Sequence, residues 1–382
     1  MTGAVKPDAE RCLDTAHCLR GTTVDVSPGE RWTRSITAVT RGLENVRAPW
    51  AHVMPRRAHA AFVKKTVNSV VGATDRVTLD YLTGSWNQGG RVLGRLHRAC
   101  VDEALLARLL REERSDSVTA ALRSFVPPDH SGCAARVVYD RLATATGRLV
   151  VRAGPQILTV RKDLRRVLRS RYGRQGLVCA LDFAGLEARI VLHEAGRGCD
   201  EPDVYGAIAR DDLHGAFPRD AVKTAVLSRM YGAGRAMVAQ CLGGSDPRMV
   251  DALIVRVGEL FEFDALGARL RLEREANGLL RNKHGRPLLL DGHDDPPDSL
   301  LVSHWAQSTG VEVSLQGFSQ LVIDLEHDGL SAMPLLVLHD ALLFDTHRDD
   351  VEALQRPRLL SVPGHAHAFP VRFEVVSDTQ GA

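Results

Sequence analysis

The sequence predicts a mixed fold, with strands at the start and the end of the second half of the chain and helices between them. Two apolar runs, "LVCALDF" at 177–183 and "LLVLHDALLF" at 335–344, predict buried strands. The stretch at 303–329, "SHWAQSTGVEVSLQGFSQLVIDLEHDG", predicts a long helix that ends at Gly329. The 382 residues, 44% hydrophobic and 25% charged, suit one multi-lobed soluble protein or two to three domains.

The first 130 residues carry fewer signals. Residues 1 to about 60 have no clear pattern, whereas 91–125 have apolar residues at spacings of three and four, which predicts amphipathic helices with a basic outer face. "VPPDHSG" at 126–132 breaks this pattern and predicts a boundary near residue 130.

Residues 161–174 form the most basic segment of the chain. Two interpretations stay open, a solvated helix face and a surface that lies along phosphate groups. Its basic residues, against the single acid Asp163, are Arg161, Lys162, Arg165, Arg166, Arg169, Arg171 and Arg174.

The remaining elements follow in order along the chain. The strand at 177–183 leads into a helix with the sequence "GLEARIVLHEA". A second helix begins after Pro218, because proline suits a first helical turn, and stops at the glycines of "GAG". Residues 247–282 are expected to be helical, 284–299 a strand or turn region, and the segment from Pro334 to the C-terminus mostly strand.

Composition excludes some classes of partner. A formal net charge of +2 gives no global attraction to nucleic acid, so any basic binding surface must be local. The seven scattered cysteines match no zinc pattern and are expected to be isolated thiols in a reducing compartment. With no apolar run long enough to span a membrane and no signal-peptide core, the protein is expected to be cytoplasmic.

Two carboxylates interrupt or end the apolar runs. Asp182 ends the first strand, and Asp340 lies between two apolar half-strands. If the strands are neighbours, the carboxylates meet at one rim of the sheet, where like charges need a cation. Oxygen ligands of this kind suit Mg²⁺, and a pair of such ions can clamp the attacking and leaving oxygens of a phosphoryl transfer. The alternative makes Asp182 a helix N-cap and Asp340 a turn residue.

A helical stripe could supply the cations for such a reaction. Arg219, Lys223, Leu227 and Tyr231 recur every four residues, so they share one helix face. The cations could hold a triphosphate and the ring could lie against a base, with the lysine able to neutralise developing charge. The alternative is an ordinary amphipathic helix. Glu187, five residues after Asp182, could face the same site or simply favour a helix N-terminus.

Five segments in order resemble the family A DNA polymerases, the group of bacterial DNA polymerase I and related phage enzymes. The resemblance runs from about Tyr139 to the C-terminus. The segments are "TATGRL", "LDFAGLEAR" (motif A), "RDAVKTAVLSRMYG" (motif B), the pair "HGRPLLL" and "HWAQSTGVEV", and "VLHDALLF" (motif C).

The resemblance implies a role for particular residues. Asp182, Asp340 and the Phe183 carbonyl match metal ligands, and Glu187 matches the residue that excludes a ribose 2′-hydroxyl. Tyr231 matches a ring beside the templating base pair. The remaining matches are triphosphate contacts at Arg219 and Lys223, and DNA contacts at Arg148, Gln307 and His339.

The chain also departs from the family pattern. Leu227 stands where Phe or Tyr usually packs by the sugar, and Ala341 replaces the Glu of motif C. Ala184 and Gly185 replace Ser and Gln in motif A, and Tyr205 lies near the usual position of a phosphate-contacting His. No segment resembles a 3′–5′ exonuclease.

The implied fold is an α+β right-hand polymerase with an antiparallel-sheet palm, helical fingers and a reduced helical thumb. The expected regions are 1–135 (N-terminal region and thumb), 136–215 (palm), 216–291 (fingers) and 292–382 (palm). The implied function is template-directed DNA synthesis without proofreading, with two Mg²⁺ ions, primer–template DNA and deoxynucleoside triphosphates.

Other functions stay open at this point. One alternative is a weak or inactive polymerase-fold DNA-binding subunit of a larger replication or repair complex. Another is a specialised primer or gap-filling polymerase with relaxed sugar selectivity. Glu187 argues against a single-subunit RNA polymerase, which needs room for the 2′-hydroxyl. The sequence does not identify any protein partner in a replication complex.

Overall fold

A computed structural model describes residues 54–74, 79–232, 235–244, 246–288, 290 and 295–378. The chain divides into two compact units, 1–79 and 80–382. The first contains helix α4 (Arg56–Thr74), and everything below concerns the second. None of the helices in the described part of the chain is both long and apolar enough to cross a bilayer.

The second unit is built on a five-stranded antiparallel sheet with the strand order β6-β7-β5-β9-β8. Both apolar runs predicted as strands are confirmed. The first forms β5, and the second forms a hairpin of β6 and β7. The strands are β5 (Gly176–Phe183), β6 (Met333–Leu338), β7 (Ala341–His347), β8 (Arg358–Leu360) and β9 (Phe369–Asp378).

The two faces of β5 have different neighbours. Phe183 points to the face covered by α15 (Asp298–His327), where its ring lies 5.3 Å from that of Phe318. Asp182 points to the opposite face, because successive side chains of a strand alternate. On that face Lys162, from a short 3₁₀ turn, forms an ion pair with Glu374 of β9. The sheet therefore separates an apolar helix-covered side from a side with charged groups.

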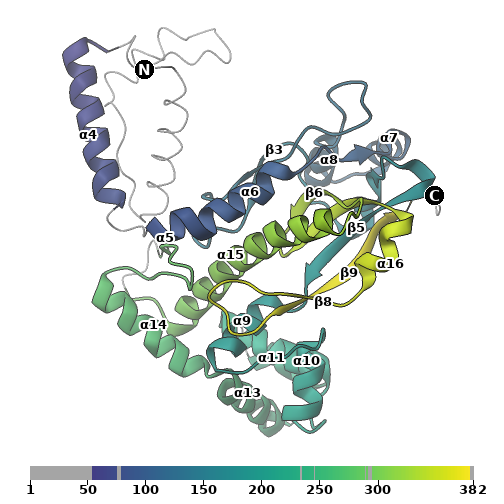
Figure 1. Ribbon diagram of the computed structural model, residues 1–382. Coiled ribbons are helices and arrows are strands. Elements are labelled where there is room, and N and C mark those ends of the chain that lie inside the picture. Colours follow the sequence, from purple (N-terminus) through teal and green to yellow (C-terminus); the bar gives the residue numbers. More distant parts are fainter. Residues whose placement is uncertain are drawn as a thin grey trace. The chain divides into compact units, whose positions relative to one another are not determined.

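Helix α15 is the long helix that the sequence predicts, and Gly329 follows its end with φ of 70°. It runs beside α6 (Asn87–Arg95) and also contacts α9, α11 and α14 (Figure 1). Gly310 of α15 lets α9 (Leu186–Glu194) pack closely against it. A Cβ at this position would lie 3.6 Å from Ile190 and Leu186 and 3.7 Å from Glu187.

A second group of helices connects β5 to α15. Helix α11 (Arg219–Tyr231) begins after Pro218 and ends at Gly232, as predicted. The segment expected to be helical over 247–282 is two helices, which Glu262 separates with a φ of 49°. The group comprises α10 (Val204–Ala207), the π-helix η4 (Ile208–Asp212), α11, α12 (Arg235–Cys241), α13 (Pro247–Phe261) and α14 (Phe263–Asn277).

Small elements complete the unit. Residues 91–125 contain helices, as predicted, together with a short strand that the periodicity did not indicate. The small elements of the whole unit are α5 (Leu79–Tyr81), the π-helix η1 (Leu82–Trp86), β1 (Cys100–Val101), α7 (Glu103–Glu112), α8 (Asp116–Arg123), β2 (Val138–Asp140), β3 (Val150–Ala153), β4 (Leu168–Arg169), α16 (Val351–Gln355) and the 3₁₀ turns η2 (Lys162–Val167), η3 (Gly173–Gln175) and η5 (Arg348–Asp350).

The basic segment 161–174 does not form the helix face considered above. It consists of η2, strand β4 paired with β1, and the start of η3. Its form follows from tertiary contacts: Arg171 donates to buried Asp345 of β7 at 3.0 Å, and Ser170 donates to the same carboxylate at 2.5 Å. Lys162 and Arg165 remain on the side of the sheet that carries Asp182. The positive charge of Lys162 acts to lower the pKa of Asp182, and that of Arg165 acts to lower the pKa of His339.

Candidate active site

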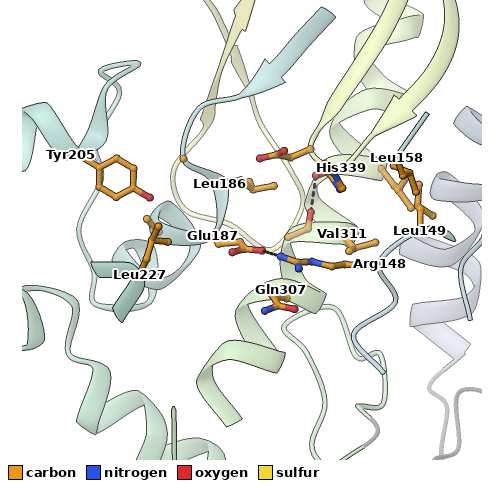
Figure 2. Close-up of a pocket in the computed structure, with 16 residues that line it drawn as sticks. Arg148, Leu149, Leu158, Leu186, Glu187, Tyr205, Leu227, Gln307, Val311 and His339 are labelled. Atoms are coloured by element: carbon orange, nitrogen blue, oxygen red, sulfur yellow. Dashed lines mark hydrogen bonds and ion pairs between the residues drawn. The ribbon is translucent and has the colours of Figure 1, made fainter. Parts of the chain in front are cut away.

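A cavity of about 430 Å³ lies between the end of β5, the β6–β7 turn, α9, α11 and α15 (Figure 2). Its lining brings together segments that are far apart in the sequence. The predicted site residues that line it are Arg148, Glu187, Leu227, Gln307, His339 and Asp340. Tyr205 of α10 lines it as well.

Asp182 and Asp340 lie at the same rim of the sheet, as the paired-carboxylate argument predicts. Asp182 pairs in register with Ala341, the residue directly after Asp340. The Phe183 N–H donates to the Asp340 carbonyl at 3.0 Å, which fixes the two chain segments against each other. The N-cap of α9 is Gly185, so the alternative role of Asp182 as a helix N-cap is wrong.

Burial disfavours the charged forms of both carboxylates, and the charge of Asp340 adds to this effect on Asp182. Burial, followed by the nearby charges of Asp340 and Glu374, raises the pKa of Asp182 to about 7. Burial also raises the pKa of Asp340. Among the described residues no side chain forms an ion pair with either carboxylate.

This arrangement fits a cation. Two oxygen donors at one rim of the sheet, partly withdrawn from water and outside any ion pair among the described residues, are stabilised when a hard divalent ion approaches. Within the described ranges no three His, Cys, Asp or Glu side chains form a ready-made metal cluster. A metal ion bound here would have two carboxylates from the described residues and would take its further ligands from backbone, water or substrate.

Glu187 connects three parts of the site. It lies in the first turn of α9, as expected, and its carboxylate accepts from Arg148 Nη2 at 2.6 Å and from the Tyr231 hydroxyl. Burial raises the pKa of Glu187, while the positive charge of Arg148 acts in the opposite direction. Figure 2 shows the Glu187–Arg148 contact at the centre of the cavity.

The stripe on α11 is divided between two surroundings. Leu227 lines the cavity and Tyr231 contacts Glu187. Arg219 instead donates to Asp203 at 2.7 Å, and the Lys223 side chain is exposed outside the cavity lining. The structure thus brings the apolar and aromatic members of the stripe to the site. Its two cations are not part of the cavity lining, although the Arg219 guanidinium carbon lies 5.9 Å from the ring centroid of Tyr205, which lines the cavity.

The remaining predicted residues have distinct positions. Gln307 of α15 and His339 of the β6–β7 turn line the cavity. His339 has a φ of 56°, an uncommon value for a residue other than glycine, and one imposed by the two-residue turn. The Phe183 side chain is buried against Phe318 and Phe369, so only its backbone can face the carboxylate pair.

The sequence did not predict a buried ionic cluster next to the cavity. Glu312 of α15 is fully buried, and accepts from the Tyr81 hydroxyl at 2.7 Å and from Arg141 and Arg286 at 3.4 Å each. Arg286 also donates to the Arg141 carbonyl at 2.7 Å and packs over Gly147, where a Cβ would lie 2.3 Å from its guanidinium. The cluster holds the loop that ends in Arg148. A buried acid in the middle of an apolar helix was the available signal.

A second missed residue completes the turn after β5. Arg189 is fully buried and donates to the carbonyls of Ala184, Cys199 and Glu201. It thereby ties the start of α9 to the segment that leads to α10. Its position at the end of "LDFAGLEAR" was the signal, although a buried arginine cannot be distinguished from an exposed one by spacing alone.

Comparison with known proteins supplies a fold but no sequence relative. No protein-family model and no curated protein matches the chain. Among solved structures, the chain is similar to the POL domain of Pol1 from M. smegmatis, solved in complex with DNA primer-template and dNTP. The TM-score is 0.63 at 14% sequence identity, and the match covers 95% of this chain and 80% of that one. The chain therefore shares with that domain a fold of mixed helices and antiparallel sheet.

Proposed function

We propose that the protein is a template-directed DNA polymerase that adds deoxynucleotides to a primer 3′-hydroxyl. The observation that carries the proposal is the pair Asp182 and Asp340, which share one rim of the sheet beside a cavity of about 430 Å³. The likeness in fold to a polymerase domain supports the same conclusion.

The carboxylate pair is the proposed metal-binding centre. Asp182 and Asp340 would hold Mg²⁺, together with the Phe183 carbonyl. Bound Mg²⁺ would lower the charge on the reacting phosphate and favour ionisation of the primer hydroxyl. The backbone hydrogen bond between Phe183 and Asp340 keeps the two ligand-bearing segments from separating. The proposed ligands would thereby be in position before substrate arrives.

The nucleotide would occupy the cavity with its triphosphate toward α11. In the present conformation Arg219 is neutralised by Asp203 and Asp220. We propose that α11 moves inward when a nucleotide binds, so that Arg219 exchanges these carboxylates for phosphate oxygens and Lys223 comes within reach of the leaving group. Arg148, Gln307 and His339 would contact the primer–template on the other side.

Primer extension with Mg²⁺ and deoxynucleotides tests this proposal. Asp182→Ala and Asp340→Ala are each expected to reduce the rate by at least about 1,000-fold, because each removes one of the two proposed metal-binding carboxylates. Asp349→Ala, a change at an exposed carboxylate on η5, is the matched control and should retain activity. The assay should compare deoxynucleotides with ribonucleotides, and DNA templates with RNA templates.

The result that would overturn the proposal is specific. A folded wild-type protein that binds primer–template and adds no nucleotide under any of these conditions would instead be a DNA-binding subunit. Ala341, where the related pattern has Glu, is expected to tune activity or primer-end positioning and would not by itself explain such a result.

A further inference from the structure

Two cysteines outside the proposed active site face each other across a backbone bridge. Cys100 lies in β1 and forms an isolated antiparallel bridge with Cys133, 33 positions later. Their sulfur atoms are 2.7 Å apart. Both residues are free thiols, and the distance is only slightly longer than the about 2.05 Å of a disulfide bond. The expectation of isolated thiols is therefore wrong for this pair.

The hydrogen-bond pattern places the two backbones at the right separation. Val101 N–H donates to the Gly132 carbonyl and Ala134 N–H donates to the Ala99 carbonyl, both at 2.9 Å. These bonds flank the two cysteines, which makes them a non-hydrogen-bonded antiparallel pair. Such pairs have a Cα separation of about 4.5 Å, within the range of about 4.4–6.8 Å that disulfides span.

Further contacts hold the segment with Cys133 in this register. Arg98 donates to the carbonyls of Cys133 at 2.8 Å and Ala134 at 2.9 Å. The same guanidinium forms two bonds to Asp129, at 2.9 and 3.0 Å. The cysteines are thus positioned by the backbone and by a neighbouring side chain, so forming a bond between their sulfurs requires little movement.

We propose that Cys100 and Cys133 are a site of reversible disulfide formation that fastens the segment around Cys133 to β1. Strand β1 pairs with β4, and β4 contacts β5 and β9 of the central sheet. The bond would close a covalent ring around α7 and α8 and attach it to the sheet that carries Asp182. This inference does not depend on the proposed polymerase activity.

A low-molecular-weight disulfide such as oxidised glutathione is the proposed oxidant. Cys133 is the more accessible thiol, whereas burial raises the pKa of Cys100 to about 12. The Cys133 thiol loses its proton and attacks one sulfur of the oxidant, forming a mixed disulfide and releasing one glutathione thiolate. Cys100 then loses its proton and attacks the Cys133 sulfur, which releases the second thiolate. Two protein thiols are oxidised, one disulfide is reduced, and the two protons end on the released thiolates.

Mass mapping of the full chain tests the site. The folded protein is equilibrated with oxidised glutathione, remaining thiols are alkylated, and the peptides are identified by mass spectrometry. We expect a linked Cys100–Cys133 peptide that is two hydrogens lighter than the sum of its parts and is separated by dithiothreitol. Cys133→Ser should abolish this peptide, while Cys241→Ser, a change at an exposed cysteine of α12, should leave it unchanged.

Thermal unfolding of the oxidised and the reduced protein gives a second measurement. The bond closes a loop of more than 30 residues, so the oxidised wild type should unfold about 3–8 °C above the reduced wild type. Cys133→Ser should show no such difference between oxidising and reducing conditions. Either of two results overturns the proposal: both cysteines remain alkylatable at equilibrium with the oxidant, or either one links to a different cysteine.

Discussion

Glu187 is the residue through which the two sides of the cavity are connected. Its carboxylate contacts Arg148 from one side and Tyr231 from the other, and its side chain packs over Gly310. A carboxylate held in this way occupies fixed space, since moving it would break a charged hydrogen bond inside a partly buried site. This geometry suits a residue that limits the size of a sugar beside it.

Removal of this carboxylate should relax sugar selectivity. Glu187→Ala is expected to increase ribonucleotide incorporation relative to deoxynucleotide by about tenfold or more, because the space beside the sugar opens and Arg148 loses its partner. The ratio of kcat/KM for the two nucleotides measures the effect. Glu201→Ala, at an exposed carboxylate paired with Arg210, is the control. A ratio equal to wild type would show that Glu187 does not set selectivity.

At the scale of elements, the turn between β5 and α9 determines where Asp182 and Glu187 lie. Gly185 forms its centre with a φ of 65°, and a Cβ there would lie 2.9 Å from Val204 Cγ1. Both features require glycine, since other residues rarely adopt this conformation and the neighbouring α10 leaves no room.

Gly185→Ala should therefore destabilise this turn. We expect a loss of about 2–3 kcal/mol in the free energy of unfolding, from the left-handed backbone and the contact with Val204 together. Urea unfolding measures it. Gly196→Ala is the matched control, since its φ is 71° but nothing lies within 4 Å of its Cβ position, so it should cost only about 1 kcal/mol. Equal losses in the two variants would argue against the steric part of the explanation.

The elements that the sequence predicts best are those whose signals are local. β5 follows from its continuous apolar run, α11 from Pro218 and Gly232, and α15 from its length and Gly329. The proximity of Asp182 and Asp340 also follows once their two strands are neighbours.

Features that depend on distant partners were not predictable from the sequence. The basic segment forms a 3₁₀ turn and a strand because Arg171 meets Asp345, a partner 174 positions away. The cluster around Glu312 connects residues up to 231 positions apart. Similarly, the helical stripe on α11 predicts a shared face for Arg219 and Tyr231. It does not predict that Arg219 donates to the Asp203 carboxylate outside the cavity lining. No periodicity reports such pairings.

At the scale of the whole molecule, a group of half-buried histidines makes stability depend on pH. Burial lowers the pKa of His193 and His284 to about 4 and that of His365 to about 3. His365 Nε2 lies 3.3 Å from His284 Nε2. Buried ring nitrogens of His193 and His365 have no hydrogen-bond partner among the residues that the structure describes. These imidazoles are therefore neutral in the folded protein over the range in which they become charged in the unfolded chain.

Several charges act on these rings besides burial. Lys283 lowers the pKa of all three, and Arg189 and His367 lower that of His193. Glu194 and Glu312 act in the opposite direction, on His193 and His284 respectively. The combined effect remains a lowering, because burial is the largest cause in each case.

The protein should lose stability as the pH falls from about 6.5 toward 4. In this window the unfolded chain binds protons that the folded histidines do not, so unfolding is favoured. Asp182 has the opposite effect, since its raised pKa of about 7 lets the folded state hold a proton that the unfolded state releases. His365→Gln should make the decline between pH 7 and pH 5 shallower by up to about one proton. Urea midpoints at several pH values measure this slope, and a slope unchanged by the substitution would refute the assignment.

The two-residue turn at His339 and Asp340 has a consequence for how the active-site geometry is set. Because only His339 and Asp340 separate the paired ends of β6 and β7, the register between β5 and β7 determines the position of Asp340. The distance between the two carboxylates is then inherited from the spacing of hydrogen-bonded strands, about 4.8 Å, and not from flexible loops. The strand register can change only by whole residues, so the distance between the carboxylates cannot be adjusted gradually. A single residue inserted into this turn would shift Asp340 by one residue position relative to β5.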